Sequence, residues 1–337
     1  MLYKTTRNDQ DAVTVQHVLT RNRGEDGGLY LPIHFPKFTE EEQNRLCTMS
    51  FNQRLAEMLN LFFSTRLTGW DVDFSTGRYP VRLEAFPHRI YLAESWHNLD
   101  GKFEHLERKL MQLIGSQADG SGSWGKIAVK MAVLAGILGE KQDLGDGPVD
   151  IVMVSGDFTG PISSWYLRKM GFPVGNIICC CNENNQLWEL LCHGQMRTDG
   201  AAVQTFIPEA DIALPVNLER LIYGCYGREE TMRFLDCISK GSMFAVSESF
   251  LAEMRRGIYV SVVSSDRVET AIPNVYNSYR YLMTPASALA YSGLMDYRSK
   301  TGITGPAVVL CDDSPACSAD AIAKAMNMTA EEIGKLI

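Results

Sequence analysis

The segment Glu94–Leu110, ESWHNLDGKFEHLERKL, gathers ionisable side chains where a predicted strand over residues 90–93 gives way to a charged helix. Imidazole and carboxyl groups at such a junction can transfer protons, and a lysine amine can act as a nucleophile. His97, Lys102 and Glu104 are therefore candidate catalytic residues. The simpler alternatives are that the histidine has only a structural role and that the charged residues lie on a solvated face of the helix.

A second candidate site is the turn in the segment VMVSGDFTGPISSWYL. A predicted buried strand ends at Val154, and Pro161 suits the first position of the helix that follows. Glycines let backbone N–H groups converge, and a helix N-terminus adds partial positive charge, so a phosphate can bind there. A turn without a ligand is the simpler reading, and a carboxylate in the turn opposes an anion unless it points away. The candidate binding residues are Ser155, Gly156, Asp157, Phe158, Thr159 and Gly160.

Strands and helices alternate from about residue 88 onward. The expected strands are 90–93, 149–154, 174–181, 258–263 and 307–311. The expected helices are 103–114, 126–138, 163–170, 186–193, 218–223, 229–238, 247–256, 287–297 and 319–326. This pattern predicts an α/β fold with a parallel sheet covered on both faces, which binds ligands beyond the carboxyl ends of its strands. Residues 1–88 are expected to form an N-terminal α+β region, with a strand over 2–5 and helices near 12–19 and 51–63.

Composition limits the classes of function. The chain has 337 residues, a net charge of −8 and no apolar run near the roughly 20 residues of a membrane helix. The acidic balance argues against nucleic acid and anionic membranes as partners. Nine cysteines without a regular spacing indicate reduced thiols in a cytoplasmic protein, and we expect no metal site.

Several segments, in chain order, resemble threonine synthase, a family of pyridoxal-phosphate (PLP) enzymes of the tryptophan-synthase-β fold type. They are RGEDGGLYLP (23–32), ESWHNLDGKF (94–103), VSGDFTG (154–160), GFPVGNIICCCNENN (171–185), DIALPVNLERLIYG (211–224), TPASALAY (284–291) and VVLCDDSPACSADAI (308–322). The resemblance implies the large parallel-sheet domain of fold-type II PLP enzymes over 89–337. It also implies PLP as cofactor, with Ser155–Gly160 at its phosphate and Asp312 opposite its pyridine nitrogen.

Departures from the family pattern fall on the residues that the resemblance assigns to the chemistry. The family's Schiff-base lysine directly follows the position of Phe103, where this chain has Glu104. A carboxylate cannot form the bond that PLP catalysis requires. Lys102 lies two positions earlier, so on a helix its side chain would point about 200° away from the required direction. Further substitutions relative to the family are Asp157, Thr159, Asp312 and Cys317.

The family also carries a smaller domain that closes over the substrate. Here a Gly/Ser-rich loop near 115–125 leads directly to the helix over 126–138, so we expect this domain to be deleted. The uncovered face then predicts a homodimer or another partner.

Three functions stay open. The first is a catalytically degenerate homologue that binds a ligand or partner. The second is an active PLP-dependent lyase that converts O-phospho-L-homoserine to L-threonine and phosphate, with Lys102 or another lysine recruited. The third is an enzyme or anion-binding module without PLP, which takes a small phosphorylated or anionic ligand and uses Glu94, His97, Glu104 and Asp312.

Overall fold

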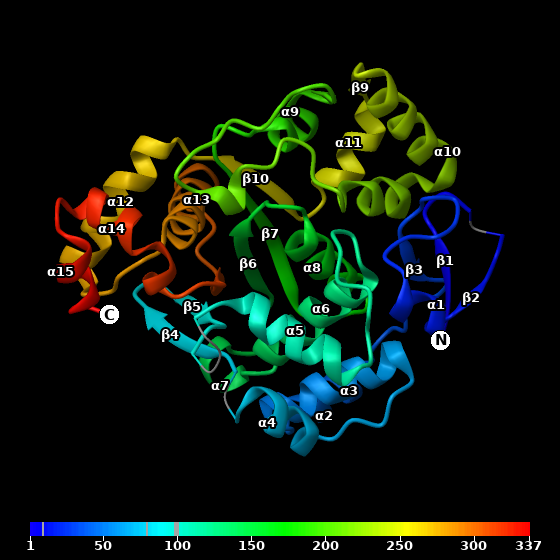
Figure 1. Cartoon of the computed structure of the whole chain (residues 1–337), viewed down its shortest axis with the longest axis horizontal. Helices are drawn as coiled ribbons and strands as arrows, with labels where there is room; N and C mark the ends of the chain where they lie inside the picture. Colours follow the sequence, from blue (N-terminus) through cyan, green and yellow to red (C-terminus); the bar gives the residue numbers. More distant parts are fainter. Residues whose placement is uncertain (9, 79, 98–100) are drawn as a thin grey trace.

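A six-stranded sheet forms the centre of the computed structural model, which describes residues 1–8, 10–78, 80–97 and 101–337 (Figure 1). Its strand order is β10-β7-β6-β11-β5-β4. Every pairing is parallel except that of β4 with β5, which is antiparallel at the edge. The strands are β4 (Arg82–Phe86), β5 (Ile90–Glu94), β6 (Val149–Val154), β7 (Val174–Cys181), β10 (Ile258–Val262) and β11 (Ala307–Cys311). The predicted α/β fold is thereby confirmed, and β4 was not anticipated.

Helices cover both faces of this sheet because successive strand residues point to opposite sides. Ile151 packs in one hydrophobic core and Val152 in the other. The first core also contains residues of α5 (Phe103–Leu113), α6 (Trp124–Leu138) and α8 (Thr159–Lys169). The second contains residues of α12 (Ser265–Tyr279), α13 (Pro285–Thr301) and α14 (Ala319–Met326). The continuous apolar strands thus reflect burial on both sides, as expected.

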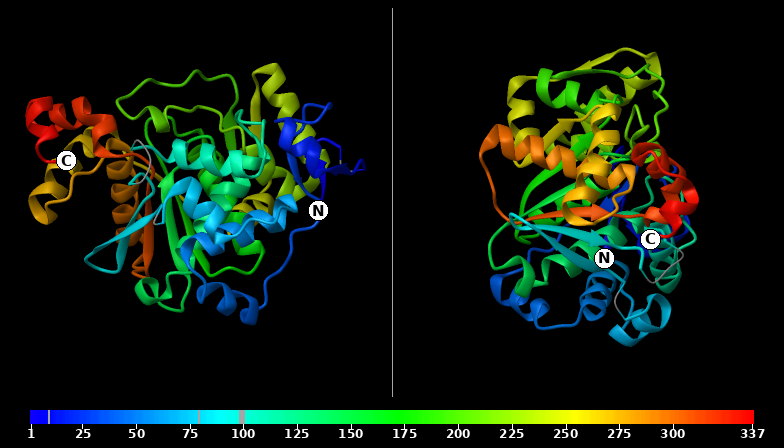
Figure 2. Two further views of the ribbon diagram at one scale, coloured as in Figure 1. Left: turned by 60° about the horizontal axis from the view of Figure 1, so that its bottom comes forward. Right: turned by 90° about the vertical axis from the view of Figure 1, so that its left-hand side faces the viewer.

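The N-terminal region adds a small sheet and four helices to the first face. Its sheet has the order β2-β1-β3, and its elements are β1 (Leu2–Thr5), β2 (Val13–Thr14), α1 (Val15–Thr20), β3 (Tyr30–Pro32), α2 (Glu40–Cys47), α3 (Phe51–Phe63) and α4 (Gly69–Thr76). Thr39, Ser50 and Thr68 begin three of these helices with capping boxes. The chain termini lie toward opposite ends of the long axis (Figure 2).

Some elements differ from those predicted. The two helices expected over 218–238 are one element, α10 (Leu218–Lys240), which is interrupted by the non-helical backbone of Gly227. Helix α8 begins at Thr159, two residues before Pro161. Helix α12 was not anticipated. The remaining elements are α7 (Lys141–Leu144), α9 (Gln186–His193), β8 (Gln195–Arg197), β9 (Met243–Ala245), α11 (Glu248–Arg255) and α15 (Ala330–Gly334).

Residues 114–123 join α5 directly to α6 and pack on the end of α1. Gln117 N donates to Leu19 O at 2.7 Å, and Gly120 N donates to Asn22 Oδ1 at 2.9 Å. The loop expected near 115–125 therefore ties the central domain to the N-terminal region. Since β4 belongs to the central sheet, this sheet begins before the division expected at residue 88, and that division stays a prediction.

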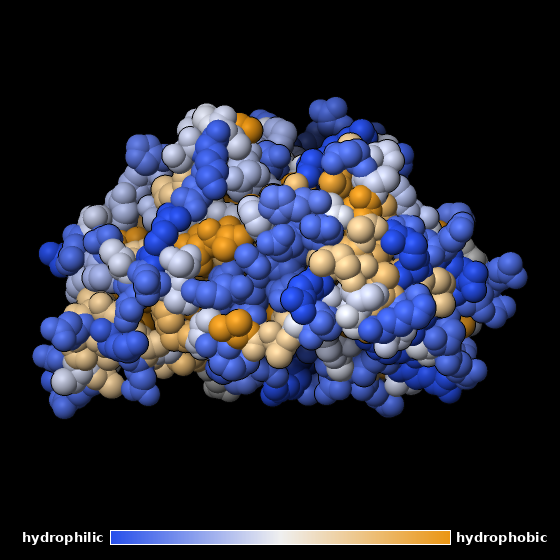
Figure 3. Space-filling model, turned by 90° about the horizontal axis from the view of Figure 1, so that it is seen from above, coloured by the Kyte–Doolittle hydropathy of each residue, from blue (hydrophilic) through white to orange (hydrophobic). Residues whose placement is uncertain are grey.

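On the face shown in Figure 3, hydrophobic residues form small groups separated by hydrophilic ones. Among the described residues, the aromatic side chains with the largest exposed fractions are Trp70 (82%) and Phe74 (96%), one turn apart on α4. No helix in the described part of the chain is long and apolar enough to cross a membrane.

Candidate functional site

A cavity of about 290 Å³ opens beyond the carboxyl ends of β6 and β11. Parallel sheets commonly bind ligands at this edge. The cavity's polar and charged lining comes from α5, α6, the turn after β6, the short 3-10 helix Pro208–Ala210 and the residues after β11. These residues are Glu107, Lys126, Lys130, Ser155, Asp157, Thr159, Glu209, Asp312 and Asp313. A larger hollow of about 510 Å³ between α2 and α6 lies away from these strand ends.

The turn Ser155–Gly160 forms one wall of the cavity. Of its six residues, all but Phe158 line the space, while Phe158 is fully buried in the core and takes a left-handed backbone conformation (φ +70°). Phe158 N donates to Ser155 O at 2.9 Å, and Thr159 N donates to the Asp157 carboxylate at 2.9 Å. The first N–H of α8 is therefore already occupied by a carboxylate of the turn itself.

Asn217 holds this turn in place from the start of α10. Its side-chain amide donates to Asp157 O at 3.1 Å and to Thr159 Oγ1 at 3.0 Å, and its backbone N–H also donates to Asp157 O. Its side-chain oxygen accepts a hydrogen bond from Arg220, which is fully buried. The conformation of the turn thus depends on α10 as well as on its own glycines.

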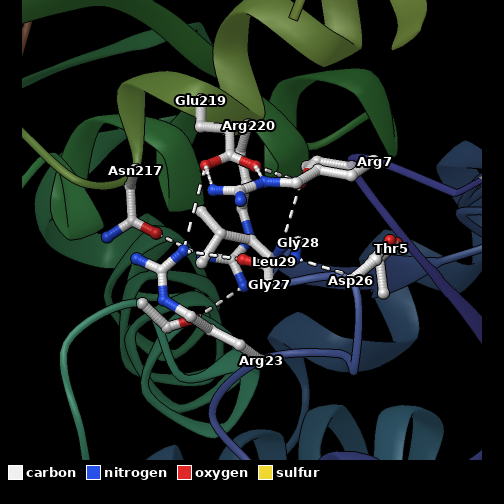
Figure 4. A network of polar contacts seen from close by, with 12 residues as sticks. Thr5, Arg7, Arg23, Asp26, Gly27, Gly28, Leu29, Asn217, Glu219 and Arg220 are labelled. Atoms are coloured by element: carbon white, nitrogen blue, oxygen red, sulfur yellow. Dashed lines mark hydrogen bonds and ion pairs between the residues drawn. The ribbon is translucent and has the colours of Figure 1, made fainter. Parts of the chain in front are cut away.

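Arg220 connects the same helix to the N-terminal region (Figure 4). Its guanidinium donates to Tyr30 O at 3.1 and 2.8 Å and to Gly122 O at 2.9 Å. Burial lowers the pKa of Arg220 to about 10, so the group remains charged at neutral pH. The neighbouring Glu219 pairs with Arg7 at 3.1 Å. The motifs 26–32 and 217–220 therefore contact each other directly, which the sequence did not reveal.

Lys130 places a buried amine at the cavity, and the sequence analysis missed it. Its Nζ lies 3.1 and 2.9 Å from the two carboxylate oxygens of Asp312 and 3.5 Å from the centre of the Phe103 ring. Lys126, one turn earlier on α6, pairs with Glu107 at 3.0 Å. Two lysines four residues apart in the otherwise apolar segment 126–138 are the signal that would have identified them.

Asp313 is the most perturbed carboxyl group of the cavity. Burial, followed by the negative charges of Asp312 and Glu209, raises its pKa to about 6, although Lys102 and Lys130 act in the opposite direction. Lys102 forms an isolated backbone bridge with Asp313, but its side chain is not part of the cavity lining.

Glu104 points away from the cavity. The Glu104 side chain is 63% exposed and pairs with Arg108 at 3.1 Å on the outer face of α5. The position that we predict to match the family's lysine is therefore on the surface.

His97 and Glu94 form a separate contact beside the cavity. The Glu94 carboxylate contacts His97 Nε2 and accepts a hydrogen bond of 2.5 Å from Tyr281 Oη. Ser95 Oγ donates to Asp312 at 3.2 Å and links this contact to the cavity. The expected cluster of four residues is thus divided, since the exposed Glu104 side chain pairs with Arg108 and does not line the cavity. The turn residues Asn98–Asp100 lie outside the described part of the chain.

The charge of the lining decides whether a phosphorylated cofactor fits. The carboxylates are Glu107, Asp157, Glu209, Asp312 and Asp313, whereas the ammonium groups are those of Lys126 and Lys130. Both ammonium groups already pair with a carboxylate. These residues do not fit the phosphate of PLP, although the cavity contains an amine.

Parts of the chain are similar to threonine synthases and to threonine synthase-like proteins. Residues 2–73 match the family described as "Threonine synthase N terminus". Human threonine synthase-like 1 is 24% identical over 146 residues, which span 42% of this chain and 20% of that protein. The threonine synthase of Pseudomonas aeruginosa is 25% identical over 173 residues, which span 51% of this chain and 36% of that protein. This chain therefore matches only a fifth to about a third of these relatives' lengths.

Solved structures show the same fold over nearly the whole chain. The PLP-bound threonine synthase of Brucella melitensis matches with a TM-score of 0.82 at 20% identity, over 96% of this chain and 91% of that one. Yeast threonine synthase matches with a TM-score of 0.85 at 16% identity, over 99% and 93%. These similarities show that the chain has the fold of the threonine synthases and that its residues 2–73 resemble the N-terminal region of that family.

Proposed function

We propose that this protein binds a small molecule in the cavity beyond β6 and β11 and does not catalyse the lyase reaction of threonine synthase. The observation that carries the proposal is the position of Glu104, a carboxylate on the exposed face of α5 where the family has its lysine. A carboxylate there can neither form a Schiff base nor reach the cavity.

The cavity also favours a different ligand from the phosphorylated one expected from the sequence. No arginine or lysine among the described residues forms an ion pair with Asp157, Glu209 or Asp313. An incoming phosphate would therefore meet carboxyl groups that no ion pair neutralises, which disfavours binding. We propose an uncharged or cationic small molecule as the ligand.

Complementation of a threonine auxotroph tests the missing lyase activity. We expect no growth from this chain, whereas yeast threonine synthase should restore growth. Release of phosphate from O-phospho-L-homoserine by the purified protein provides the direct assay. Growth together with phosphate release would overturn the proposal.

Binding is tested by thermal unfolding with two probes. Pyridoxine, an uncharged ring without an aldehyde, should raise the melting temperature, while inorganic phosphate should not. A protein with an enlarged side chain in the cavity, Ala286→Trp, provides the control and should lose the pyridoxine effect. A shift produced by phosphate alone would contradict the proposed ligand class.

An active lyase is the second candidate, favoured by the buried amine of Lys130 beside Phe103. If it is correct, Lys130→Ala should abolish complementation and Lys102→Ala should not. The cytoplasmic location and the homodimer also remain proposals, and sedimentation tests the homodimer.

A further inference from the structure

We propose that β4 is a self-association strand, along which a second copy of this chain pairs antiparallel and extends the central sheet. The inference assigns a surface to the homodimer proposed above, and it does not depend on the ligand cavity. It places the two-fold axis beside Leu83, so that this residue faces its own copy across the interface.

The outer edge of β4 is unpaired. β4 is the last strand of the sheet, and its five residues pair with β5 without a bulge. Figure 1 shows it at the margin of the sheet. Among the described residues, no backbone hydrogen bond joins β4 to any element other than β5. Alternate N–H and C=O groups of an edge strand point outward, where they form a template for a further strand.

The opposite edge of the sheet is less accessible. β10 is also an edge strand, but α9 and α11 pack against it, and its residues are buried or half-buried. In β4, the Arg82 and Ala85 side chains are exposed and the other three are half-buried. β4 contains neither proline nor lysine, two residues with which proteins commonly protect an exposed edge. Of the two edges, β4 is therefore the one that a partner can reach.

The charges of β4 are complementary to those of a second β4. Arg82 and Glu84 lie on one face of the strand, and their side chains, 61% and 37% exposed, pair at 2.7 Å. When two copies pair antiparallel about Leu83, Arg82 of each copy lies directly opposite Glu84 of the other. The interface then contains two pairs of opposite charge, which stabilise strand pairing. An axis beside Glu84 would instead place two glutamates opposite each other, which destabilises the pairing.

Apolar side chains flank these charges on both faces of the strand. Leu83 packs partly against the first core, and its two copies meet at the axis. On the other face, the Phe86 ring lies 5.0 Å from that of Tyr279, which is 41% exposed. A partner strand covers part of these side chains and so adds apolar burial to the backbone hydrogen bonds. The interface is nevertheless small, so we expect a dissociation constant in the micromolar range.

Sedimentation velocity of the full chain over a range of concentrations measures the association. We expect a reversible equilibrium between monomer and dimer. Glu84→Arg should weaken the dimer by at least about tenfold, because both pairs of opposite charge become repulsive. Arg82→Glu should have the same effect, whereas a mixture of the two variants should regain the dimer, since each supplies the charges that the other lacks. Glu25→Arg, which changes an exposed pair with Arg21, is the control and should leave the association unchanged.

Cysteine cross-linking tests the register of the pairing. Leu83→Cys should form a disulfide between its two copies under mild oxidation, because directly opposite strand residues lie about 4.5–5.5 Å apart. In Ala85→Cys, the two copies of the new thiol would lie four residues apart along the strands, about 14 Å, and should not join. The nine native cysteines require that mass spectrometry identify the linked peptide.

A chain that stays monomeric at every concentration would overturn the proposal and leave the edge to a different partner. A dimer that Glu84→Arg does not weaken and Leu83→Cys does not link would also overturn it. Arg82 faces Glu94 on β5, so if Arg82→Glu does not fold, these two variants still decide. The pyridoxine effect separates the two proposals. A monomer that responds to pyridoxine rejects the interface alone, and a dimer that does not respond rejects the ligand cavity alone.

Discussion

The side-chain amide of Asn217 donates a 3.0 Å hydrogen bond to Thr159 Oγ1 and so joins the start of α10 to the start of α8. The same residue accepts from Arg220, which reaches the N-terminal region through Tyr30. A continuous chain of hydrogen bonds therefore runs from the N-terminal region to the wall of the cavity.

Asn217→Asp should weaken both the fold and the cavity. The change keeps an oxygen for Arg220 but removes the amide hydrogens that bond Asp157 and Thr159, and it buries a further carboxylate. We expect the free energy of unfolding to fall by about 2 kcal/mol and pyridoxine binding to weaken. Urea denaturation and a binding titration measure the two effects. The exposed Asn44→Asp, whose oxygen still accepts from Lys141, should change neither.

Arg220→Lys should destabilise the protein although it preserves the charge. A lysine has one nitrogen and cannot reach Tyr30 O, Gly122 O and Asn217 together as the planar guanidinium does. We expect a loss of about 3 kcal/mol in the free energy of unfolding, because buried acceptors are left unpaired. Arg21→Lys on the surface should cost less than about 1 kcal/mol. Equal effects of the two changes in urea denaturation would contradict the structural role of Arg220.

The central sheet was predictable because burial on both faces leaves a local signal. Strands such as Val149–Val154 and Val174–Cys181 are short, continuous apolar runs, and their predicted bounds match the structure. β4 was missed because it is an edge strand with mostly half-buried or exposed residues, including Arg82 and Glu84. Helix α12 was missed because Pro273 lies inside it, where proline usually ends a helix.

The site was less predictable than the fold, because it depends on contacts between distant segments. The turn Ser155–Gly160 was found from its local pattern of strand, glycines and helix. Lys130 lies 182 positions before Asp312, and no local pattern joins them. That Glu104 matches the family's lysine stays a prediction, and its exposure could be seen only in the structure.

Glu104→Lys should not restore threonine synthase activity. The new ammonium would lie on the exposed face of α5, and it would lose the ion pair with Arg108. A positive charge in the first turn also opposes the helix dipole, so we expect a loss of about 0.5–1 kcal/mol in stability. Complementation of the auxotroph provides the measurement, with the unchanged chain as control. Growth of the strain would show that α5 can turn this position toward the cavity.

Asp313→Asn should stabilise the protein at alkaline pH. The folded-state pKa of about 6 lies above the ordinary value of 3.8. Protonated Asp313 therefore contributes stability that is fully present below pH 3.8 and is lost as the pH rises through 6. Asparagine stays neutral and avoids this loss. The shift corresponds to about 3 kcal/mol, which we reduce to about 1 kcal/mol because the group is partly exposed.

Asp296→Asn is the matched control, and it should change the stability at alkaline pH in the opposite direction. Hydrogen bonding to Arg267 lowers the pKa of Asp296, so its stabilising contribution is present above pH 3.8 and is lost as the pH falls through the lowered pKa. Asp296→Asn should therefore reduce stability at about pH 8. Urea denaturation at about pH 8 and about pH 4.5 compares the two variants. An Asp313→Asn protein that is no more stable than the unchanged chain at the higher pH would show that this carboxyl group ionises without penalty.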